Sequence, residues 1–359
     1  MRSVVYFGLY DAREVPGVHQ KVTGVLRAAA AEGFATRAWA EPFSRSVGLR
    51  RLSAAIDAAT ETHLVLRSTG WANLLLMPAL WRARRRGVQI AIDVPSPNRV
   101  SVQEIWQSRQ SLWRRARTVG LIYLSGPWSL WPATRIVHYA PESWWFRIGN
   151  AARSVEIGNG IDVATIEPRS GAPAWPAPVL QVIAVASVAR WHGYDRLLRA
   201  VKGFAERADP PFAIHVTIAG DGPALPQLRE LSASLGLGEQ VTFAGIVTGT
   251  ALRELYARSH LAVSSLGLHR IGLTRASVLK AREYCAVGIP FIASGDDPDF
   301  STGQPFRFVI SGSEETRDVI QAFEAFARDG QQIDTARMRQ YAIDHLDWRH
   351  KAGAFGVGA

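Results

Sequence analysis

The sequence predicts an α/β protein made of two doubly wound domains in series, facing each other across a cleft. The chain of 359 residues is too long for one ordinary core, since domains commonly have about 150–200 residues. Short apolar strands alternate with amphipathic helices in both halves, as in parallel sheets with helical crossovers. A segment with four prolines separates the halves. The predicted parts are a first domain at 1–160, a linker at 161–178, a second domain at 179–336 and a helix at 337–359 that packs back on the first domain.

The first half opens with a strand, a loop that contains glycine, and a helix. Residues 4–9 are apolar, Gly17 lies in the loop, and residues 18–32 have helical spacing. This order predicts a ligand loop at the carboxyl end of the strand, although an ordinary turn explains one glycine equally well. The later strands are predicted at 63–68, 89–94, 135–138 and 154–157, with a helix at 73–85.

Polar residues follow several of these strands. Arg67 lies near the end of the second strand, Asp93 and Asn98 flank the end of the third, and His138 ends the fourth. Doubly wound domains bind ligands at the carboxyl ends of their strands, so these residues are candidates for a site. Turn chemistry around two prolines explains Asp93 and Asn98 equally well, and a structural histidine is an alternative for His138.

The second half repeats the alternation. Strands are predicted at 180–186, 213–219, 241–245, 261–264 and 291–294. Helices are predicted at 194–207, 225–235, 250–258, 277–286 and 338–351. Gly220 and Gly222 follow the strand at 213–219, and Gly245 ends the strand at 241–245.

The stretch from Ile271 to Ser294 is a loop, a helix that ends at Gly288, and a buried strand. Arg275, Lys280, Arg282 and Glu283 gather near the start of this helix. Free backbone amides and flanking basic residues at a helix N-terminus favour a phosphate. A carboxylate slightly deeper can accept hydrogen bonds from sugar hydroxyls. The stretch therefore predicts a nucleotide-sugar site.

Charge is distributed unevenly along the chain. Residues 1–160 contain 21 Lys and Arg against 10 Asp and Glu, whereas residues 161–359 contain 20 against 21. Nine of the twelve tryptophans also lie in the first part. Basic residues with aromatics suit an anionic membrane surface or nucleic acid, and buried packing beside a solvated face is the plain alternative. The scattered arginines and the lack of a nucleic-acid motif favour no nucleic-acid partner.

The bulk features predict a cytoplasmic protein. The single cysteine, Cys285, forms no internal disulfide and suits a reducing compartment. The N-terminus is a strand rather than a signal peptide, and no apolar run is long enough to span a bilayer. The nine histidines are scattered without metal-ligand spacing, so no metal site is expected.

Five motifs, in order, resemble the retaining glycosyltransferases of family 4, which have the GT-B fold. They are Gly158–Asp162, Val185–Gly193, Gly220–Pro223, Val241–Gly245, and Leu279–Tyr284 followed by Gly288–Pro290. The last, with the WHGYDR loop from Trp191, is similar to one subgroup of the family. The resemblance implies that the second domain binds a nucleotide diphosphate-sugar and that the first binds a saccharide or lipid-linked acceptor.

The resemblance also assigns roles to residues. It implies Lys280, Arg190 and Asp93 as catalytic candidates, with Glu283 accepting hydrogen bonds from the ribose. Further donor-binding candidates are Ser187, His192, Gly222, Gly245, Gly272, Leu273, Thr274, Arg275 and Ser277. Acceptor-side candidates are Gly17, His19, Arg67, Asn98 and His138. Transfer in this family is thought to occur on one face of the sugar, with the leaving diphosphate assisting deprotonation of the acceptor and without a metal or cofactor.

The chain departs from the family pattern at three positions of the second domain, and a histidine that the family commonly has on a strand end of the first domain has no counterpart near residues 93–96. Arg275 stands where the family usually has Glu, Ser187 where it has Arg, and His192 where it has Lys. Alternatives are therefore a degenerate GT-B protein that binds a nucleotide-sugar or saccharide as an assembly subunit, and a nucleotide-sugar epimerase. The main prediction is an active hexosyltransferase of cell-surface polysaccharide or glycoconjugate synthesis, which is peripheral at the inner face of the cell membrane.

Overall fold

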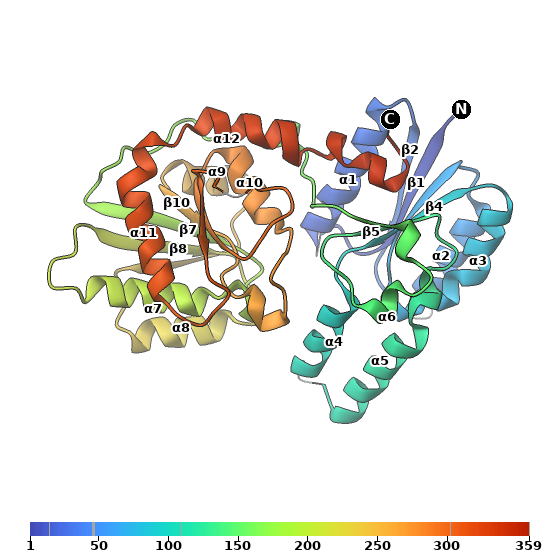
Figure 1. Ribbon diagram of the computed structural model, residues 1–359, viewed down its shortest axis with the longest axis horizontal. Coiled ribbons are helices and arrows are strands. Elements are labelled where there is room, and N and C mark those ends of the chain that lie inside the picture. The colour runs from blue at the N-terminus through green and yellow to red at the C-terminus, as the bar shows by residue number, and fades with distance from the viewer. Residues whose placement is uncertain (14, 45–46, 109, 302, 359) are drawn as a thin grey trace. The chain divides into compact units, whose positions relative to one another are not determined.

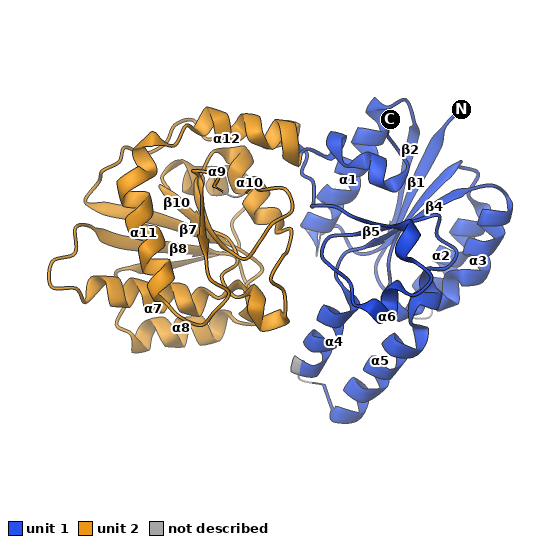
Figure 2. Cartoon of the chain, viewed as in Figure 1, with its two compact units in different colours: residues 1–162, 347–359 blue, residues 163–346 orange. Residues whose placement is uncertain are grey.

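The computed structural model describes residues 1–13, 15–44, 47–108, 110–301 and 303–358. The chain forms two compact units: unit 1 contains residues 1–162 and 347–359, and unit 2 contains residues 163–346 (Figure 2). Residues 163–178, expected to be a linker, thus belong to unit 2. The indole of Trp175 in this segment packs against Phe212 and Phe326, with ring centroids 5.3 and 5.4 Å away.

Unit 1 is built on a six-stranded sheet of order β2-β1-β3-β4-β5-β6, in which every neighbouring pair is parallel (Figure 1). Its strands are β1 (Ser3–Leu9), β2 (Ala35–Glu41), β3 (His63–Arg67), β4 (Gln89–Val94), β5 (Arg135–His138) and β6 (Ser154–Glu156). Its helices are α1 (Pro16–Ala31), α2 (Val47–Ala58), α3 (Asn73–Arg85), α4 (Asn98–Gln107), α5 (Leu112–Ser125) and α6 (Trp144–Arg147).

The two faces of this sheet form separate cores, because successive side chains of a strand point to opposite faces. Val5 and Phe7 of β1 join the residues of α2 and α3 in one cluster. Val4 and Tyr6 join residues of α1 and the C-terminal segment in the other. A doubly wound layer arrangement follows, as the sequence predicts.

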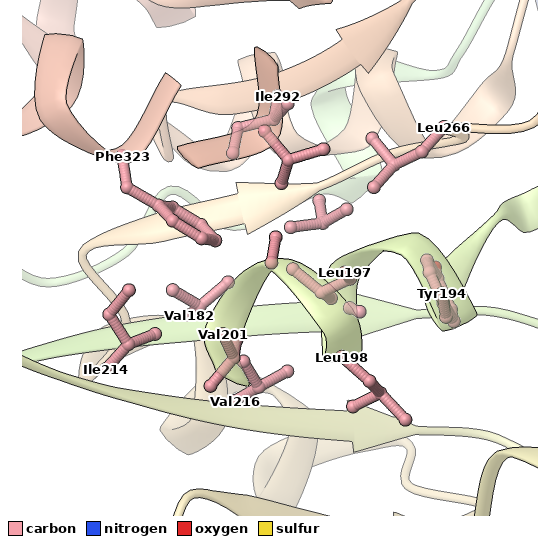
Figure 3. Close-up of a cluster of buried hydrophobic side chains, with 14 of the residues drawn as sticks. Val182, Tyr194, Leu197, Leu198, Val201, Ile214, Val216, Leu266, Ile292 and Phe323 are labelled. Atoms are coloured by element: carbon pink, nitrogen blue, oxygen red, sulfur yellow. The ribbon is translucent and has the colours of Figure 1, made fainter. Parts of the chain in front are cut away.

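Unit 2 has a parallel sheet of order β12-β11-β10-β7-β8-β9. Its strands are β7 (Val179–Val185), β8 (Ala213–Ala219), β9 (Val241–Gly245), β10 (Leu261–Val263), β11 (Phe291–Ser294) and β12 (Arg307–Ile310). Its helices are α7 (Tyr194–Ala205), α8 (Leu225–Ser234), α9 (Gly249–Ala257), α10 (Leu279–Val287), α11 (Arg317–Asp329) and α12 (Thr335–Tyr341). Leu197 and Val201 of α7 pack over the sheet together with Phe323 of α11 (Figure 3).

The predicted C-terminal helix, residues 338–351 within 337–359, is wrong. Helix α12 ends at Tyr341, a π-helical turn covers 342–346, and short 3-10 turns follow. Asp347 pairs with Ile161 as an isolated bridge, and its side chain caps the next turn by accepting from the Arg349 amide. The indole of Trp348 is buried in unit 1, and these contacts hold it in a conformation that a continuous helix does not have.

Candidate functional site

The loops at the carboxyl edge of the unit 2 sheet are packed tightly by glycine. A Cβ on Gly220 would lie 1.8 Å from the Ala186 carbonyl oxygen, and one on Gly222 would lie 2.4 Å from the Val188 oxygen. Any larger residue would push the loop after β7 away from the loop after β8. Gly222, a predicted donor-binding residue, therefore has a packing role, because it lets the loops after β7 and β8 approach each other closely.

Helix α10 begins beside these loops and carries an amine and a carboxylate on one face. Lys280 and Glu283 are three residues apart, which places their side chains next to each other on a helix. The Lys280 Nζ donates to the Tyr194 hydroxyl at 3.3 Å and lies 5.8 Å from the centre of the Trp191 ring. Burial lowers the pKa of Lys280 to about 7, against the attraction of Glu283.

The Glu283 carboxylate is oriented by a tyrosine from another helix. The Tyr256 hydroxyl of α9 donates to Glu283 Oε1 at 2.9 Å. Burial raises the pKa of Glu283, while the bond from Tyr256 and the charge of Lys280 act in the opposite direction. Two tyrosines from separate elements therefore fix the amine and the carboxylate that the sequence assigned to the donor.

The loop after β7 is held by His192. This imidazole is buried, and its Nδ1 accepts a hydrogen bond from the Ala189 amide at 2.9 Å. Burial, with repulsion from Lys280, lowers the pKa of His192 to about 2, so the ring is neutral at ordinary pH. His192 thus cannot supply the charge of the lysine that the family has here, and the prediction that it binds donor is corrected to a role in holding the loop. Ser187 and Arg190 are exposed on the same loop.

The segment before α10 contributes backbone more than charge. Gly272 takes a left-handed conformation (φ +66°) and ends a 3-10 turn, and the buried Leu273 gives its amide to the Leu268 carbonyl. Thr274 is exposed, and its carbonyl accepts from the Asp296 amide at 2.9 Å. Leu273 therefore has an occupied amide and no exposed side chain, contrary to its prediction as a donor-binding residue.

The remaining donor-side candidates differ in exposure. Arg275 is exposed and forms an isolated parallel bridge with Asp296, whereas Ser277 is buried next to the start of α10. Gly245 has φ +67° and open space where a side chain would begin. Arg275 and Gly245 are thus accessible, while Ser277 is packed.

Arg282 lies on the opposite, buried side of α10. Its guanidinium donates to Asp297 at 2.6 and 2.7 Å and to Asp299 at 2.5 Å, and none of its side chain is exposed. The two carboxylates outweigh the effect of burial and raise its pKa. The expectation that Arg282 helps to bind phosphate is wrong, because its donors are engaged inside the unit.

In unit 1, Asp93 is the centre of a buried charge cluster. Lys21 Nζ donates to Oδ1 at 2.7 Å, and the Tyr6 hydroxyl donates to Oδ2 at 2.5 Å. Arg67 lies 3.5 Å from Oδ2. Burial alone would raise the pKa of Asp93, but Lys21 and Arg67 hold it below its usual value. The catalytic assignment of Asp93 is corrected, because a carboxylate with no exposed surface and both oxygens bonded does not reach a substrate.

The other acceptor-side candidates are dispersed around the carboxyl edge of the unit 1 sheet. His138 is buried, and burial with repulsion from Arg147 lowers its pKa to about 4. Asn98 is engaged with Glu142, which accepts from its backbone and side-chain nitrogens at 2.7 and 3.0 Å. Gly17 and His19 are exposed in the first turn of α1. Within the described part of unit 1, no hydrogen bond or ion pair joins these residues to one another, so the structure supplies an accessible helix start rather than an assembled site.

Sequence reasoning missed Tyr194, Tyr256 and Lys21. Tyr194 was within the WHGYDR loop but was assigned only to a helix. Tyr256 lies 27 residues before Glu283, and Lys21 lies 72 residues before Asp93. Partners so far apart in the chain leave no local sequence pattern from which their contact could be predicted.

Neither a metal centre nor a membrane-spanning helix is found among the described residues. No group of three or more His, Cys, Asp and Glu side chains there is arranged to hold a metal ion. None of the described helices combines the length and the apolar character needed to cross a membrane.

Known proteins resemble the chain at three levels. Residues 179–329 match the model of the glycosyl transferases group 1. A stretch of 119 residues is 31% identical to mannosylfructose-phosphate synthase of Agrobacterium fabrum, covering 32% of this chain and 25% of that protein. This chain therefore spans about a quarter of the length of that curated relative.

Two solved structures cover nearly the whole chain. Sucrose-phosphate synthase of Thermosynechococcus elongatus has a TM-score of 0.70 at 16% identity, over 99% of this chain and 98% of that one. The catalytic domain of starch synthase IV from Arabidopsis thaliana, bound to ADP and acarbose, has a TM-score of 0.68 at 10% identity, over 99% and 98%. The predicted GT-B fold is confirmed.

Proposed function

We propose that the protein is a retaining hexosyltransferase, because residues 179–329 match the model of the group 1 glycosyl transferases in a chain with the GT-B fold. It moves a hexose-type sugar from a nucleotide diphosphate-sugar to a saccharide or lipid-linked saccharide. The observation that carries the proposal is the pair of Lys280 and Glu283 on one face of α10, each oriented by a tyrosine.

The donor is assigned to the carboxyl edge of the unit 2 sheet. Lys280 supplies positive charge to the diphosphate, and the start of α10 supplies backbone amides, since its N-cap residue makes no side-chain cap. Glu283 accepts hydrogen bonds from the ribose. Arg190 is the second basic candidate for the diphosphate, and its exposed side chain is free to reorient. The base lies beside Gly245, where open space permits it.

The chemistry follows from a site that stabilises a leaving group. The bond between the anomeric carbon and the diphosphate oxygen breaks, and the acceptor oxygen forms the new bond on the same face. The acceptor proton passes to the departing diphosphate. Lys280 and Arg190 stabilise the negative charge that develops on that group, which is the task assigned to a metal ion in other transferases. The proposal is therefore a metal-independent transfer that uses no protein nucleophile.

The basic, tryptophan-rich unit 1 gives the proposed setting. An excess of 11 positive charges in residues 1–160 attracts the protein to an anionic surface. We place the enzyme at the inner face of the cell membrane, where it would extend lipid-linked saccharides of cell-surface polysaccharide or glycoconjugate.

A second candidate is a degenerate GT-B subunit that holds a nucleotide-sugar or saccharide without turnover. The neutral, buried His192 favours it, because the charge expected at that position is missing. It differs from the first candidate only in the rate of nucleotide release.

The test has two stages. A thermal-shift panel of uridine, guanosine, adenosine and thymidine diphosphate-sugars identifies the base, and nucleotide release is then measured with candidate acceptors in the presence of a chelator. The proposal predicts acceptor-dependent release and a product with the donor's anomeric configuration by NMR. Binding without release would favour the degenerate subunit, and an inverted product or loss of activity with the chelator would contradict the stated mechanism.

A further inference from the structure

Helix α5 carries large apolar side chains on its outer face. Leu112, Trp113 and Leu124 have exposed fractions of 72%, 75% and 75%, and Tyr123 is also exposed. Of the helix residues, only Ile122 and Ser125 are buried. An ordinary surface helix shows the opposite arrangement, with its apolar stripe toward the core.

The exposed side chains lie along one face of the helix, at its two ends. Trp113 and Leu124 are eleven residues apart, which is close to three helical turns, so they lie on the same face about 16 Å apart along the axis. At the carboxyl end of α5, the Trp145 indole donates to the Tyr123 carbonyl at 3.4 Å and brings the 75% exposed Trp144 beside the helix. We call Leu112, Trp113, Tyr123, Leu124 and Trp144 the α5 surface.

The neighbouring helix extends this face. Helix α4 packs against α5, and the pair projects from the rest of unit 1 (Figure 1). Arg115 donates to the Trp106 carbonyl at 2.9 Å, which holds the exposed Trp106 near the amino-terminal half of α5. Aromatic side chains therefore flank both ends of the α5 surface.

Every charged residue of the sequence between Glu104 and Glu142 is an arginine. The sequence has no Asp or Glu between Glu104 and Glu142, and exposed Arg114, Arg117 and Arg147 flank the apolar side chains. A second copy of the chain would place these arginines against each other. A nucleic acid would match the arginines, but its phosphates gain nothing from Leu112 and Leu124. An anionic bilayer matches both features, because it offers negative headgroups above an apolar interior.

We propose that the α5 surface docks the protein on anionic lipid bilayers, with α5 lying in the plane of the interface. Leu112, Trp113, Leu124 and Trp144 enter the boundary between headgroups and acyl chains, and the arginines bind the headgroups. The surface deepens the proposed function, on which it rests for its purpose of bringing the enzyme to a lipid-linked acceptor. The docking itself is argued from unit 1 alone.

Vesicle co-sedimentation of the full chain tests this surface. Vesicles of phosphatidylcholine alone are compared with vesicles of equal parts phosphatidylcholine and phosphatidylglycerol, at low and high salt. We expect binding to the second kind and weaker binding at high salt. The pair Trp113→Ser and Leu124→Ser should weaken binding by more than about tenfold. The pair Arg114→Gln and Arg117→Gln should weaken it by about fivefold per arginine.

Two control variants alter similar side chains elsewhere. Val309→Ser changes an exposed apolar residue of β12, and Arg85→Gln changes an exposed arginine of α3. Both should bind vesicles as the wild type does, and circular dichroism should show that all variants are folded. Equal binding of both vesicle types, no binding, or controls as weak as the α5 variants would overturn the proposal.

The other occupants have their own signatures, which would also overturn it. Self-association lost with Trp113→Ser and Leu124→Ser, seen by light scattering without vesicle binding, would assign the face to a second copy. DNA or RNA retention lost with the arginine variants, again without vesicle binding, would assign it to nucleic acid. Nucleotide-sugar binding is measured separately without lipid. Vesicle binding without donor binding would then refute only the proposed transferase, and donor binding without vesicle binding would refute only the docking.

Discussion

Lys280 makes donor binding depend on pH. Burial lowers the pKa of its ammonium to about 7 in the empty site, so about half of the molecules are charged at that pH and about a tenth one pH unit higher. A diphosphate beside Nζ favours the charged form and raises this pKa. Above pH 7 the protein must therefore take up a proton with the donor. Linkage predicts that Kd rises about tenfold per pH unit until the pH reaches the pKa of Lys280 in the complex.

The assay is calorimetric titration of a nucleotide-sugar from below pH 7 to about two units above it. Lys280→Arg is the matched control, because a guanidinium stays protonated throughout and the profile should become flat. His192 does not contribute, since its pKa of about 2 lies far outside this range. A flat profile for the wild type, or affinity that increases with pH, would refute the assignment of Lys280 to the diphosphate.

Three further predictions concern stability, measured by urea unfolding. A methyl group on Gly24 would lie 2.2 Å from Trp348 Cδ1, so Gly24→Ala should displace the buried indole and lower the free energy of unfolding by about 3 kcal/mol. In the control Gly120→Ala the new methyl group meets nothing within 4 Å, so the free energy of unfolding should not fall. Equal losses of stability in the two variants would contradict the packing of Gly24 against Trp348. Arg282→Met removes the guanidinium that pairs with the buried Asp297 and the partly buried Asp299 and should cost about 3–5 kcal/mol, with a smaller loss than about 1 kcal/mol arguing against the ion pairs. The pKa of His138 is about 4 in the folded state against 6.5 when unfolded, so this residue should contribute up to about 3 kcal/mol to the loss of stability as the pH drops from 6.5 to 4. His138→Gln should therefore lose less stability than the wild type over this range, and equal losses would contradict the burial of a neutral ring.

The sequence predicted the fold well where local patterns repeat. Helix α10 and strand β11 were read correctly from their apolar runs, and Gly288 ends the helix with φ +89°, as a C-cap glycine should. The order of strands and helices was enough to identify two doubly wound units. No element was predicted at β2 or α2, because the exposed edge strand ATRAWAE lacks a continuous apolar run.

The site was predicted less completely, because burial and pairing depend on distant residues. Lys280 and Glu283 were predicted from their place near the start of one helix and from the family resemblance, but the tyrosines that contact them come from α7 and α9. Asp93 looked like a strand-end catalytic group until Lys21 and Tyr6 were seen to occupy its oxygens. Arg282 was grouped with the basic residues at the helix start, because its partners Asp297 and Asp299 lie beyond the strand that follows the helix.

The exposed apolar face of α5 could not be predicted from composition either. The sequence showed that arginine and tryptophan gather in the first half, with buried packing as an equal alternative. Phe146 is buried as that alternative requires, whereas Trp113 and Trp144 are exposed. Only the tertiary structure separates the two groups.

The central claim is that the carboxyl edge of unit 2 binds a nucleotide diphosphate-sugar through Glu283 and Lys280. Its most direct test is calorimetric binding of the panel's best nucleotide-sugar to the wild type, Glu283→Ala and the control Glu230→Ala, an exposed carboxylate of α8. Loss of the charged hydrogen bonds to the ribose should weaken binding to Glu283→Ala by at least about tenfold, with Glu230→Ala unchanged. Binding to a folded Glu283→Ala with wild-type affinity, or no binding of any nucleotide-sugar to the wild type, would contradict it.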